Sequence, residues 1–417
     1  MKKEKSIIFF GIIGSLLLLA MGFLPFFSLS IAQPSKDVKT LKVGCTLPLN
    51  TGMGVETKKM LEVIVPKFND AGDLIVKGQR YQIDLIIYDD KYSAESGRAA
   101  VERLVYQDKV KFMVCQIGSA PIVAGLSTTE SEKVMNMVGG ASPKIVSPKN
   151  QYIFGTSTTR TSIPPLWMMV KKVFPNAKTV VFISPDDETG RARAKEETQV
   201  AEAFGVKVLQ VLHYPRDTVD FSSIAAKAKS FNSDLIDYPG AVAGTKFGLQ
   251  LKAMYEAGFR GGHVSAITPQ MDEITAVASN EALEGLLCTM QGTEVPSPSP
   301  LAREVKQDYM KKYGKWSEAS LTWIHAWYAF IQAIKKADSL DPVVIANLIA
   351  TKGLEWEIPN GKAMLVKRPD LENNKYCDTC SEMAYGQIKS GKLAYIGRIS
   401  LDETVSACEK VFGGKWR

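Results

Sequence analysis

The chain has 417 residues, 45% of them hydrophobic and 23% charged, which is the composition of a globular protein large enough for two domains of ordinary size. The formal net charge is +7, but the basic residues are scattered, and no dense Lys/Arg run is interleaved with aromatic residues. We therefore interpret the charge as solvated surface and expect no nucleic-acid partner.

The first 32 residues have the organisation of a secretory signal peptide. Three lysines within the first five residues precede an uncharged apolar run that extends from residue 6 to about residue 27. Ser30, Ile31 and Ala32 then form a small-x-small cleavage pattern. We expect an exported chain that is cleaved near Ala32. An uncleaved membrane anchor is the alternative, because the apolar run is long enough to span a bilayer.

The six cysteines are Cys45, Cys115, Cys288, Cys377, Cys380 and Cys408. Cys45 and Cys115 lie in apolar segments and are expected to be buried core thiols. Export permits disulfides, so we expect a structural disulfide near the C-terminus, with the pairing among Cys377, Cys380 and Cys408 left open. Cys377 and Cys380 also form a C-x-x-C pattern, for which a thiol-redox role is a less favoured hypothesis.

Short apolar segments alternate with segments of helical periodicity, which is the pattern of parallel sheets covered by helices. In the first part of the chain, strands are expected at 41–49, 81–88, 110–117 and 134–139, with a short extended segment at 152–156. The pattern restarts with expected strands at 179–184, 206–212, 235–238 and 263–267. Helices are expected at 94–107, 321–337 and 341–350, and short strands at 363–366, 383–389 and 393–399. The fold class is therefore α/β, with two doubly wound parallel sheets.

Two neighbouring strands of the first sheet end close to a serine that is near a proline. Segment 110–117 is followed by Ser119, and segment 134–139 is followed by Ser142. Serine is a good N-cap and proline is tolerated in the first helical turn. The carboxyl ends of strands in open α/β sheets bind ligands, and free N–H groups at helix starts favour anions. The sequence thus predicts a carboxylate-binding site around Ser119 and Ser142.

No motif of known catalytic chemistry is present in the sequence. It contains no phosphate-binding Walker motif, no G-x-G-x-x-G, no G-x-S-x-G and no H-E-x-x-H. Ser119 has no recognisable base partner, and the three histidines show no metal-ligand spacing. We therefore expect a protein that is not an enzyme and that needs no cofactor and no metal.

The order and spacing of the motifs resemble the periplasmic solute-binding proteins of ABC importers, of type I fold, and specifically the branch that binds the branched-chain amino acids leucine, isoleucine and valine. The segments that carry the resemblance are Leu41 to Leu49, Asn69-Asp-Ala-Gly72, Tyr88-Asp-Asp90, Ala100 to Val105, Ile117-Gly-Ser119, Val138-Gly-Gly-Ala-Ser142, Phe154 to Ser157, Leu283-Glu-Gly-Leu286 and Trp323 to Ile334. The resemblance extends over nearly all of the mature chain.

This resemblance implies two α/β lobes joined by three crossover strands near 156–162, 285–293 and 356–363. The first lobe would comprise 40–157 plus 292–355, and the second 158–291 plus 356–417. The ligand, an amino acid or another carboxylate or amide, would lie in the cleft, and the lobes would close on it by hinge motion. The implied partners are an ABC permease and its ATPase, and the mature chain would be a soluble periplasmic monomer.

In the first lobe, the resemblance places the carboxylate of the ligand at Ser119 and its neighbour Ala120. The backbone and hydroxyl at Ala141 and Ser142 would assist. Two residues at the same sheet edge, Met53 and Tyr92, are expected to have surface or packing roles, and Tyr238 is as readily a core residue as a ligand contact.

In the second lobe, the sequence departs from the pattern of the leucine-type proteins. Thr189 replaces a tyrosine, Ala241 or Val242 replaces an aromatic residue, and Gln270 replaces the glutamate that pairs with the ligand's ammonium. A buried ammonium without a charge partner is costly, so the ligand is expected to be a carboxylate lacking an amine, an amide or an aromatic acid, unless Asp272 or Glu273 takes the place of the glutamate. A ligand-sensing receptor subunit of the same fold is the alternative function.

Overall fold

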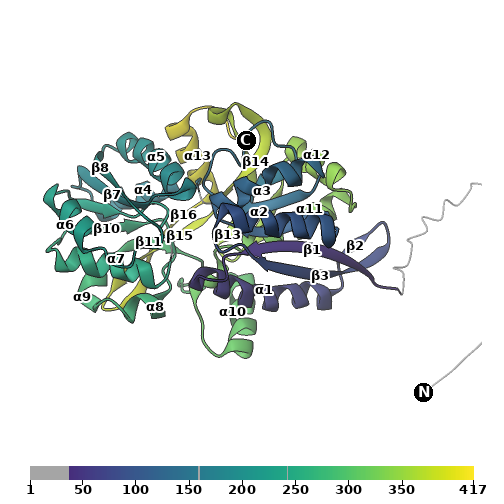
Figure 1. The fold of residues 1–417 in the computed structure, drawn as a ribbon, viewed down its shortest axis with the longest axis horizontal. Helices are drawn as coiled ribbons and strands as arrows, with labels where there is room; N and C mark the ends of the chain where they lie inside the picture. The colour runs from purple at the N-terminus through teal and green to yellow at the C-terminus, as the bar shows by residue number, and fades with distance from the viewer. Residues whose placement is uncertain (1–36, 158–159, 242) are drawn as a thin grey trace, which may run out of the picture. The chain divides into compact units, whose positions relative to one another are not determined.

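The computed structural model describes residues 37–157, 160–241 and 243–417. The expected signal peptide and Val242 lie outside these residues. The described chain forms two large sheets with helices on both faces of each (Figure 1). The predicted α/β class, with one sheet for each lobe, is confirmed. None of the described helices is long and apolar enough to cross a membrane.

The first sheet has the strand order β2-β3-β1-β4-β5-β6. Its strands are β1 (Lys39–Leu47), β2 (Ile75–Val76), β3 (Gln79–Asp89), β4 (Phe112–Ile117), β5 (Met135–Gly139) and β6 (Ile153–Gly155). All neighbours pair in parallel except the short β2, which is antiparallel to β3. Every residue of β4 and β5 is buried, as expected for central strands covered on both faces. These two strands carry the predicted serines at their carboxyl ends.

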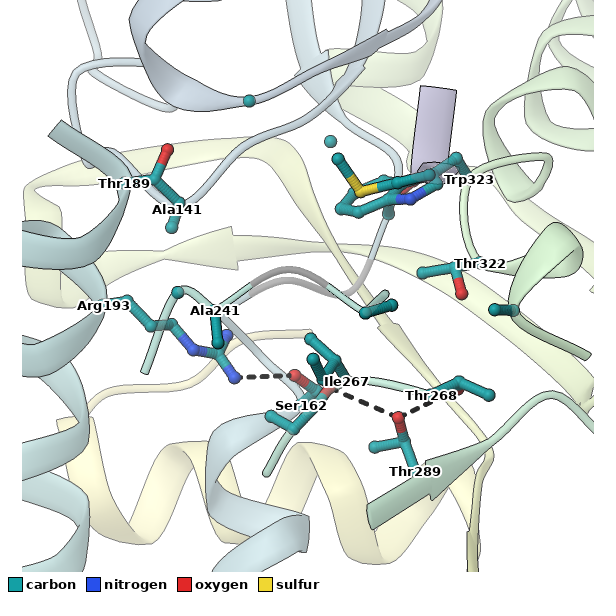
Figure 2. A pocket seen from close by; sticks show the side chains of 18 of the residues that line it. Ala141, Ser162, Thr189, Arg193, Ala241, Ile267, Thr268, Thr289, Thr322 and Trp323 are labelled. Atoms are coloured by element: carbon teal, nitrogen blue, oxygen red, sulfur yellow. Dashed lines mark hydrogen bonds between the residues drawn. The ribbon is translucent and has the colours of Figure 1, made fainter. Parts of the chain in front are cut away.

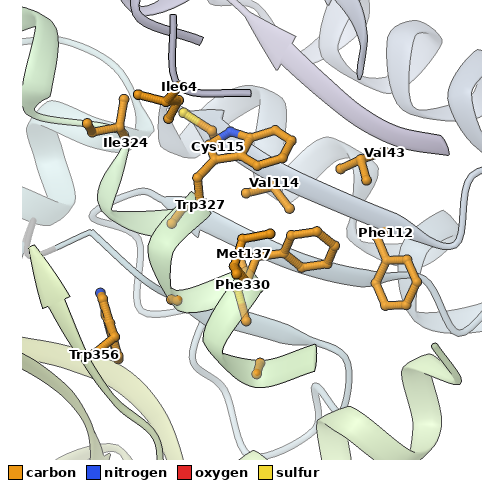
Figure 3. Packing of buried hydrophobic residues seen from close by; sticks show 14 of the residues in the cluster. Val43, Ile64, Phe112, Val114, Cys115, Met137, Ile324, Trp327, Phe330 and Trp356 are labelled. Atoms are coloured by element: carbon orange, nitrogen blue, oxygen red, sulfur yellow. The ribbon is translucent and has the colours of Figure 1, made fainter. Parts of the chain in front are cut away.

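Helices cover both faces of the first sheet. They are α1 (Gly52–Ala71), α2 (Ala94–Glu102), α3 (Ser119–Ser131), α10 (Pro300–Tyr313), α11 (His325–Ala337) and α12 (Pro342–Lys352). Helices α1 and α11 lie on one face, where Trp327 and Phe330 of α11 pack against Val114 and Met137 of the strands (Figure 3). Helices α2 and α3 pack against each other on the other face. The aromatic stripe of α11 is therefore core, as its helical spacing indicates.

The second sheet has the strand order β16-β15-β11-β10-β9-β7-β8. Its strands are β7 (Thr179–Pro185), β8 (Lys207–Tyr214), β9 (Leu235–Asp237), β10 (Gly262–Ser265), β11 (Leu287–Met290), β15 (Met383–Lys389) and β16 (Lys392–Ile399). Strands β7 to β11 are parallel, and β15 and β16 add an antiparallel edge. The second sheet is therefore mixed, and its antiparallel edge is formed by the strands expected at 383–389 and 393–399.

The helices of the second lobe are α4 (Ile163–Val173), α5 (Glu188–Ala203), α6 (Ser222–Ser230), α7 (Thr245–Glu256), α8 (Met271–Thr275), α9 (Asn280–Leu283) and α13 (Leu401–Phe412). One apolar cluster joins α4 and α5 to the sheet, and a second joins α6 and α7 to its other face. Helix α5 begins at the carboxyl end of β7. Its start is fixed because the side chain of Asp187 caps the helix by accepting from Gly190 N at 2.9 Å.

A third, antiparallel sheet of β12 (Glu355–Ile358), β13 (Gly361–Arg368) and β14 (Asn373–Ser381) precedes β15. Trp356, Ile358 and Ala363 belong to the apolar cluster of the first lobe. The resemblance places the third crossing near 356–363, whereas the chain joins the second sheet at Glu382, between β14 and β15. We therefore propose that the first lobe extends to Ser381, later than the predicted division at residue 356.

Three local features differ from the sequence-based expectations. The expected helix 94–107 changes to π geometry over Arg103–Gln107. The expected helix 321–337 begins as a 3-10 turn, Glu318–Leu321, and becomes α-helical only at His325. Strand β14 and helix α13 are not among the predicted elements. The capping box at the start of α13, formed by Ser400 and Glu403, is a sequence signal for that helix.

All six cysteines are buried free thiols in the structure, so the expected C-terminal disulfide is not formed. Cys377 and Cys380 lie in different apolar clusters because residues an odd number of positions apart on a strand point to opposite faces. Cys380 shares its cluster with Cys408. Burial raises the pKa of Cys377 to about 12, which suppresses the reactive thiolate. The C-x-x-C pattern is thus not a redox pair in this structure.

Alkylation tests the state of the cysteines. Purified exported protein that is unfolded without a reductant should take up an alkyl group at all six cysteines, whereas the native protein should react slowly because every thiol is buried. Mass spectrometry counts the added groups. Uptake at only four cysteines would show that a disulfide forms after all, and peptide mapping would then identify its two cysteines.

Candidate ligand-binding site

A cavity of about 110 Å³ lies at the carboxyl ends of the strands of both large sheets, well above the roughly 10–15 Å³ that one water needs. Its lining comes from both lobes and from the segments that connect them. The lining includes Met53, Glu56, Tyr92, Gly139, Ala141, Ser162, Thr189, Arg193, Tyr238, Ala241, Gln270, Gln291, Trp323, His325 and Asn360. Several of them are shown in Figure 2. A pocket between two domains is a common position for a small-molecule site.

Direct contacts join the two lobes beside the cavity. The Thr189 hydroxyl of α5 accepts from Ser119 N at 3.1 Å and lies 3.3 Å from the Tyr92 hydroxyl. The Arg216 guanidinium lies 4.5 Å from the centre of the Tyr92 ring. The Ser142 hydroxyl donates to Glu188 Oε1 at 2.6 Å. Because these bonds connect loops of the first lobe to the start of α5 and the loop after β8 in the second, the structure has the lobes in contact around the cavity.

The predicted residues of the first lobe divide into lining and supporting residues. Ala141 lines the cavity, but Ser119, Ala120 and Ser142 are not among its lining residues. The Ser119 hydroxyl is fully buried and accepts from Ala141 N at 2.9 Å and Ser142 N at 3.0 Å. The serine therefore occupies the N–H groups that the sequence argument assigns to a ligand carboxylate. Its place here is that of a support for the wall of the cavity.

The predicted residues of the second lobe, Thr189, Ala241 and Gln270, all line the cavity. Gln270 is buried, and its side-chain Oε1 has no hydrogen-bond partner among the described residues. The acidic residues Asp272 and Glu273, which follow Gln270 closely in the sequence, are bound to other residues. Asp272 pairs with Lys315 at 2.6 Å, and Glu273 accepts from Thr245 N at 2.9 Å at the start of α7. Neither acid lines the cavity, so neither replaces the missing glutamate.

Arg193 brings a permanent positive charge to the cavity. It lies on α5, is 6% exposed, and is directed towards Ser162 and the loop at Ala241 (Figure 2). Its Nη2 lies 3.5 Å from Ser162 Oγ and its Nε lies 3.4 Å from Glu197 Oε2. A guanidinium has five N–H donors, and these two long contacts with described residues engage only part of it. Its place in the lining puts the guanidinium where it can meet an anionic group in the cavity.

Two buried acidic residues, Glu197 and Asp237, lie close to Arg193. Glu197 is fully buried and also accepts from the Trp167 indole at 3.3 Å. Burial raises the pKa of Asp237 well above its usual range, and the neighbouring Glu197 carboxylate raises it further. Glu197 and Asp237 thus place two buried acidic side chains beside the guanidinium, and the contact with Glu197 helps to hold the side chain of Arg193 in the cavity wall.

Glu56 supplies the acidic side chain among the described lining residues, and it is already paired. It accepts from Lys59 Nζ at 2.6 Å and from Ser320 Oγ at 3.2 Å, and also from the Tyr309 hydroxyl. Burial alone would raise the pKa of Glu56, but the hydrogen bonds from Lys59 and Tyr309 outweigh it and lower that pKa. Glu56 is therefore ionised and neutralised by Lys59, which leaves it a weak partner for a ligand cation.

Large flat and flexible apolar side chains form much of the remaining wall. Trp323 stands against Gly139, where an added Cβ would lie 2.5 Å from the indole ring. Figure 2 shows Trp323 on the opposite side of the cavity from Arg193. Met53, Tyr92 and Tyr238 also line the cavity. Such walls favour an apolar or aromatic body between polar ends.

Sequence reasoning did not identify Arg193, Trp323, Gln291 or Asn360 as site residues. Arg193 lies on the face of α5 that carries buried residues, and a buried arginine on such a face is a signal for a paired or ligand-binding charge. Trp323 lies in the expected helix 321–337 and begins one of the segments that carry the family resemblance, but it is not predicted to contact a ligand. Gln291 follows β11 of the second large sheet, and Asn360 follows β12 of the third sheet. Their place at the cavity depends on tertiary structure.

The two-lobed α/β fold, with a cavity at the strand ends of both lobes, is that of a type I periplasmic binding protein. The family model described as "Periplasmic binding protein" matches residues 41–376. The chain therefore belongs to the periplasmic binding protein family, which is a family of solute-binding proteins and not of enzymes.

Individual relatives are distant. A Leu/Ile/Val-binding protein homolog 8 of Brucella melitensis biotype 1 is 23% identical over 345 residues, which cover 78% of this chain and 82% of that protein. A leucine-binding protein of Thermotoga maritima superposes with a TM-score of 0.69 at 20% identity, covering 87% of this chain and 99% of the other. A solute-binding protein of an R. palustris ABC transporter, in complex with 4-hydroxybenzoate, gives a TM-score of 0.69 at 19% identity, covering 87% and 97%. At these identities, the solved structures show the fold.

A buried histidine in the cavity wall makes stability depend on pH. Burial lowers the pKa of His325 to about 4, whereas a histidine in an unfolded chain titrates near about 6.5. The unfolded chain therefore binds the proton first, and the folded protein loses stability as the pH falls from about 6.5 towards 4. Relative to wild type, the ligand-free His325→Gln variant should gain about 2 kcal/mol of unfolding free energy between pH 7 and pH 5.

Urea unfolding of both proteins at each pH measures this difference. His213→Gln is the matched control, because His213 is exposed. Parallel pH profiles for wild type and His325→Gln would contradict the burial of a neutral imidazole at this position.

Proposed function

We propose that this chain is the exported substrate-binding component of an ABC importer, which captures a small carboxylate between its lobes and delivers it to a permease and its ATPase. The signal peptide would be removed near Ala32, and the mature protein would act as a monomer. Membership of the periplasmic binding protein family supports the general role. The relatives include proteins named for leucine, isoleucine and valine and a protein in complex with 4-hydroxybenzoate.

The observation that carries the ligand class is the buried guanidinium of Arg193 in the wall of the cavity. Arginine matches a carboxylate through charge-assisted, often bidentate hydrogen bonds. The proposed ligand contacts are Arg193 with Ala141, Thr189, Ala241 and Gln270. Ser119, Ala120 and Ser142 would hold the wall and the lobe contacts, and would not bind the carboxylate themselves.

A carboxylate without an ammonium group fits the cavity better than a branched-chain amino acid does. Gln270 is neutral, and Asp272 and Glu273 bind other groups. Glu56 is neutralised by Lys59. An ammonium enclosed here would lack an unpaired carboxylate and would carry the cost of its desolvation. We therefore favour aromatic and other amine-free carboxylates as ligands over leucine, isoleucine and valine.

Substitution of Arg193 tests this proposal. A thermal-shift screen first selects the ligand from benzoates, aliphatic carboxylates, amides and branched-chain amino acids, since a ligand that binds the folded protein raises its melting temperature. Arg193→Gln should then weaken binding of the selected carboxylate by about 10- to 100-fold, because a charge-assisted hydrogen bond contributes roughly 1.5–3 kcal/mol. Isothermal titration calorimetry measures the affinities.

Arg191→Gln is the matched control, because Arg191 lies on the same helix but is exposed and pairs with Asp186. It should bind the carboxylate like wild type. Unchanged affinity in the Arg193→Gln variant, or stronger binding of an uncharged amide than of its carboxylate, would contradict the assignment.

A further inference from the structure

Besides Gln270, two further amide side chains in the lining of the cavity have oxygen atoms without a hydrogen-bond partner among the described residues. Gln291 directly follows β11, and Asn360 lies in the turn between β12 and β13. Both residues line the cavity and are almost fully buried, at 4% and 1% exposure. Gln291 Oε1 and Asn360 Oδ1 accept no hydrogen bond from any described residue.

A chain of hydrogen bonds fixes which end of the Gln291 amide is left without a partner among the described residues. The Thr289 hydroxyl donates to the carbonyl oxygen of Ala266 at 3.3 Å. It therefore accepts from the Thr268 hydroxyl, which lies 3.1 Å away (Figure 2). The Thr268 oxygen is left to accept from Gln291 Nε2 at 2.8 Å. Gln291 Nε2 is therefore the donor of this hydrogen bond, and Oε1 is the amide atom without a partner among the described residues.

The orientation of Asn360 is fixed in the same way. Its Nδ2 donates to the carbonyl oxygen of Met290 at 3.1 Å, and a carbonyl oxygen accepts only. A Cβ built on Gly292 would lie 2.7 Å from Asn360 Oδ1, so this side chain lies against the backbone next to Gln291. Two oriented acceptor groups therefore come from adjoining segments, one directly after β11 and one in the turn between β12 and β13.

A buried acceptor without a donor is unfavourable by roughly 1–3 kcal/mol. One such atom is a local imperfection, but two that are held in a fixed orientation at a ligand cavity indicate that the ligand brings the donor. No unpaired carboxylate accompanies them among the described lining residues, because Glu56 is bound to Lys59. The matching donor is therefore neutral, as a hydroxyl group is, and not an ammonium.

We propose that the ligand is a hydroxylated aromatic carboxylate, whose hydroxyl group donates to Gln291 Oε1 and Asn360 Oδ1 while its carboxylate binds Arg193. This inference rests on the proposed function of the cavity and specifies the ligand further. Trp323 and Tyr92 supply flat walls for the ring. Figure 2 shows Thr268, to which Gln291 is bonded, across the cavity from Arg193, so the two polar ends of such a ligand have separate partners.

Calorimetry with ligands that differ by a single hydroxyl group tests the inference. The probes are benzoate, 3-hydroxybenzoate, 4-hydroxybenzoate and 3,4-dihydroxybenzoate, with leucine as the amine-bearing comparison. Wild type should bind at least one hydroxylated probe ten-fold or more tightly than benzoate, because a site with buried acceptors discriminates against a ligand that lacks the donor. In Gln291→Met and in Asn360→Leu, this ratio should fall to near one.

Two further variants make the result independent of folding defects. Gln291→Glu keeps an acceptor oxygen and should retain more of the preference for the hydroxyl group than Gln291→Met does. Gln387→Met is the matched control, because Gln387 lies on β15 beside β11, donates to Gly285 O at 2.9 Å and does not line the cavity. It should leave the ratio unchanged. Melting temperatures of the ligand-free variants verify that each one is folded.

Equal affinities for benzoate and its hydroxylated forms would overturn the inference, as would a preference that survives in both Gln291→Met and Asn360→Leu. Stronger binding of leucine than of the hydroxylated probes, or no binding of any hydroxylated probe, would also overturn it. A carboxylate that still depends on Arg193 but not on these two amides would leave the proposed function standing while this inference fails. The two conclusions are therefore tested separately.

Discussion

The burial of one guanidinium, that of Arg193, is the constraint on which the rest of the cavity depends. A buried charge is stable only when it is paired and hydrogen-bonded. Glu197 supplies the acidic partner of Arg193, and Asp237 is a second buried acid close to Glu197. The contacts of Arg193 are long, at 3.4 and 3.5 Å, and a ligand carboxylate would complete them. In the proposed complex, the attraction for the carboxylate thus comes from the second lobe.

The hydroxyl groups of the cleft serve mainly to hold the lobes and their loops together. Ser119 anchors the backbone at Ala141 and Ser142, and Thr189 accepts from Ser119 N across the cleft. Such bonds are modest individually, at about 0.5–1.5 kcal/mol, which would allow the proposed hinge to open again. Ligand contacts made by both lobes would stabilise only the closed state and so shift the equilibrium towards it.

The sequence predicted the architecture well because alternating strands and helices leave a strong periodic signal. The buried strands β4 and β5 and the apolar face of α11 are examples.

The sequence predicted the cavity less completely. Thr189, Ala241 and Gln270 line it as expected, but the hydroxyl of Ser119 turns to its own backbone neighbours, and Arg193 was missed. The place of a motif along the sequence predicts which loop lies at the edge of a sheet. Whether a side chain bonds to backbone, to the other lobe or to a ligand depends on packing between segments distant in sequence, as with Gln291 and Asn360. Packing between segments distant in sequence also underlies the proposed third crossing at Glu382, because Trp356 of β12 packs in the apolar cluster of the first lobe.

The structure of the complex with the tightest-binding carboxylate tests the central claim most directly. The account predicts both carboxylate oxygens at the guanidinium of Arg193, with N···O distances of about 2.7–2.9 Å, and Ser119 Oγ still bonded to the N–H groups of Ala141 and Ser142. A carboxylate bound instead to those two N–H groups, with the Ser119 hydroxyl displaced and Arg193 without ligand contact, would contradict it.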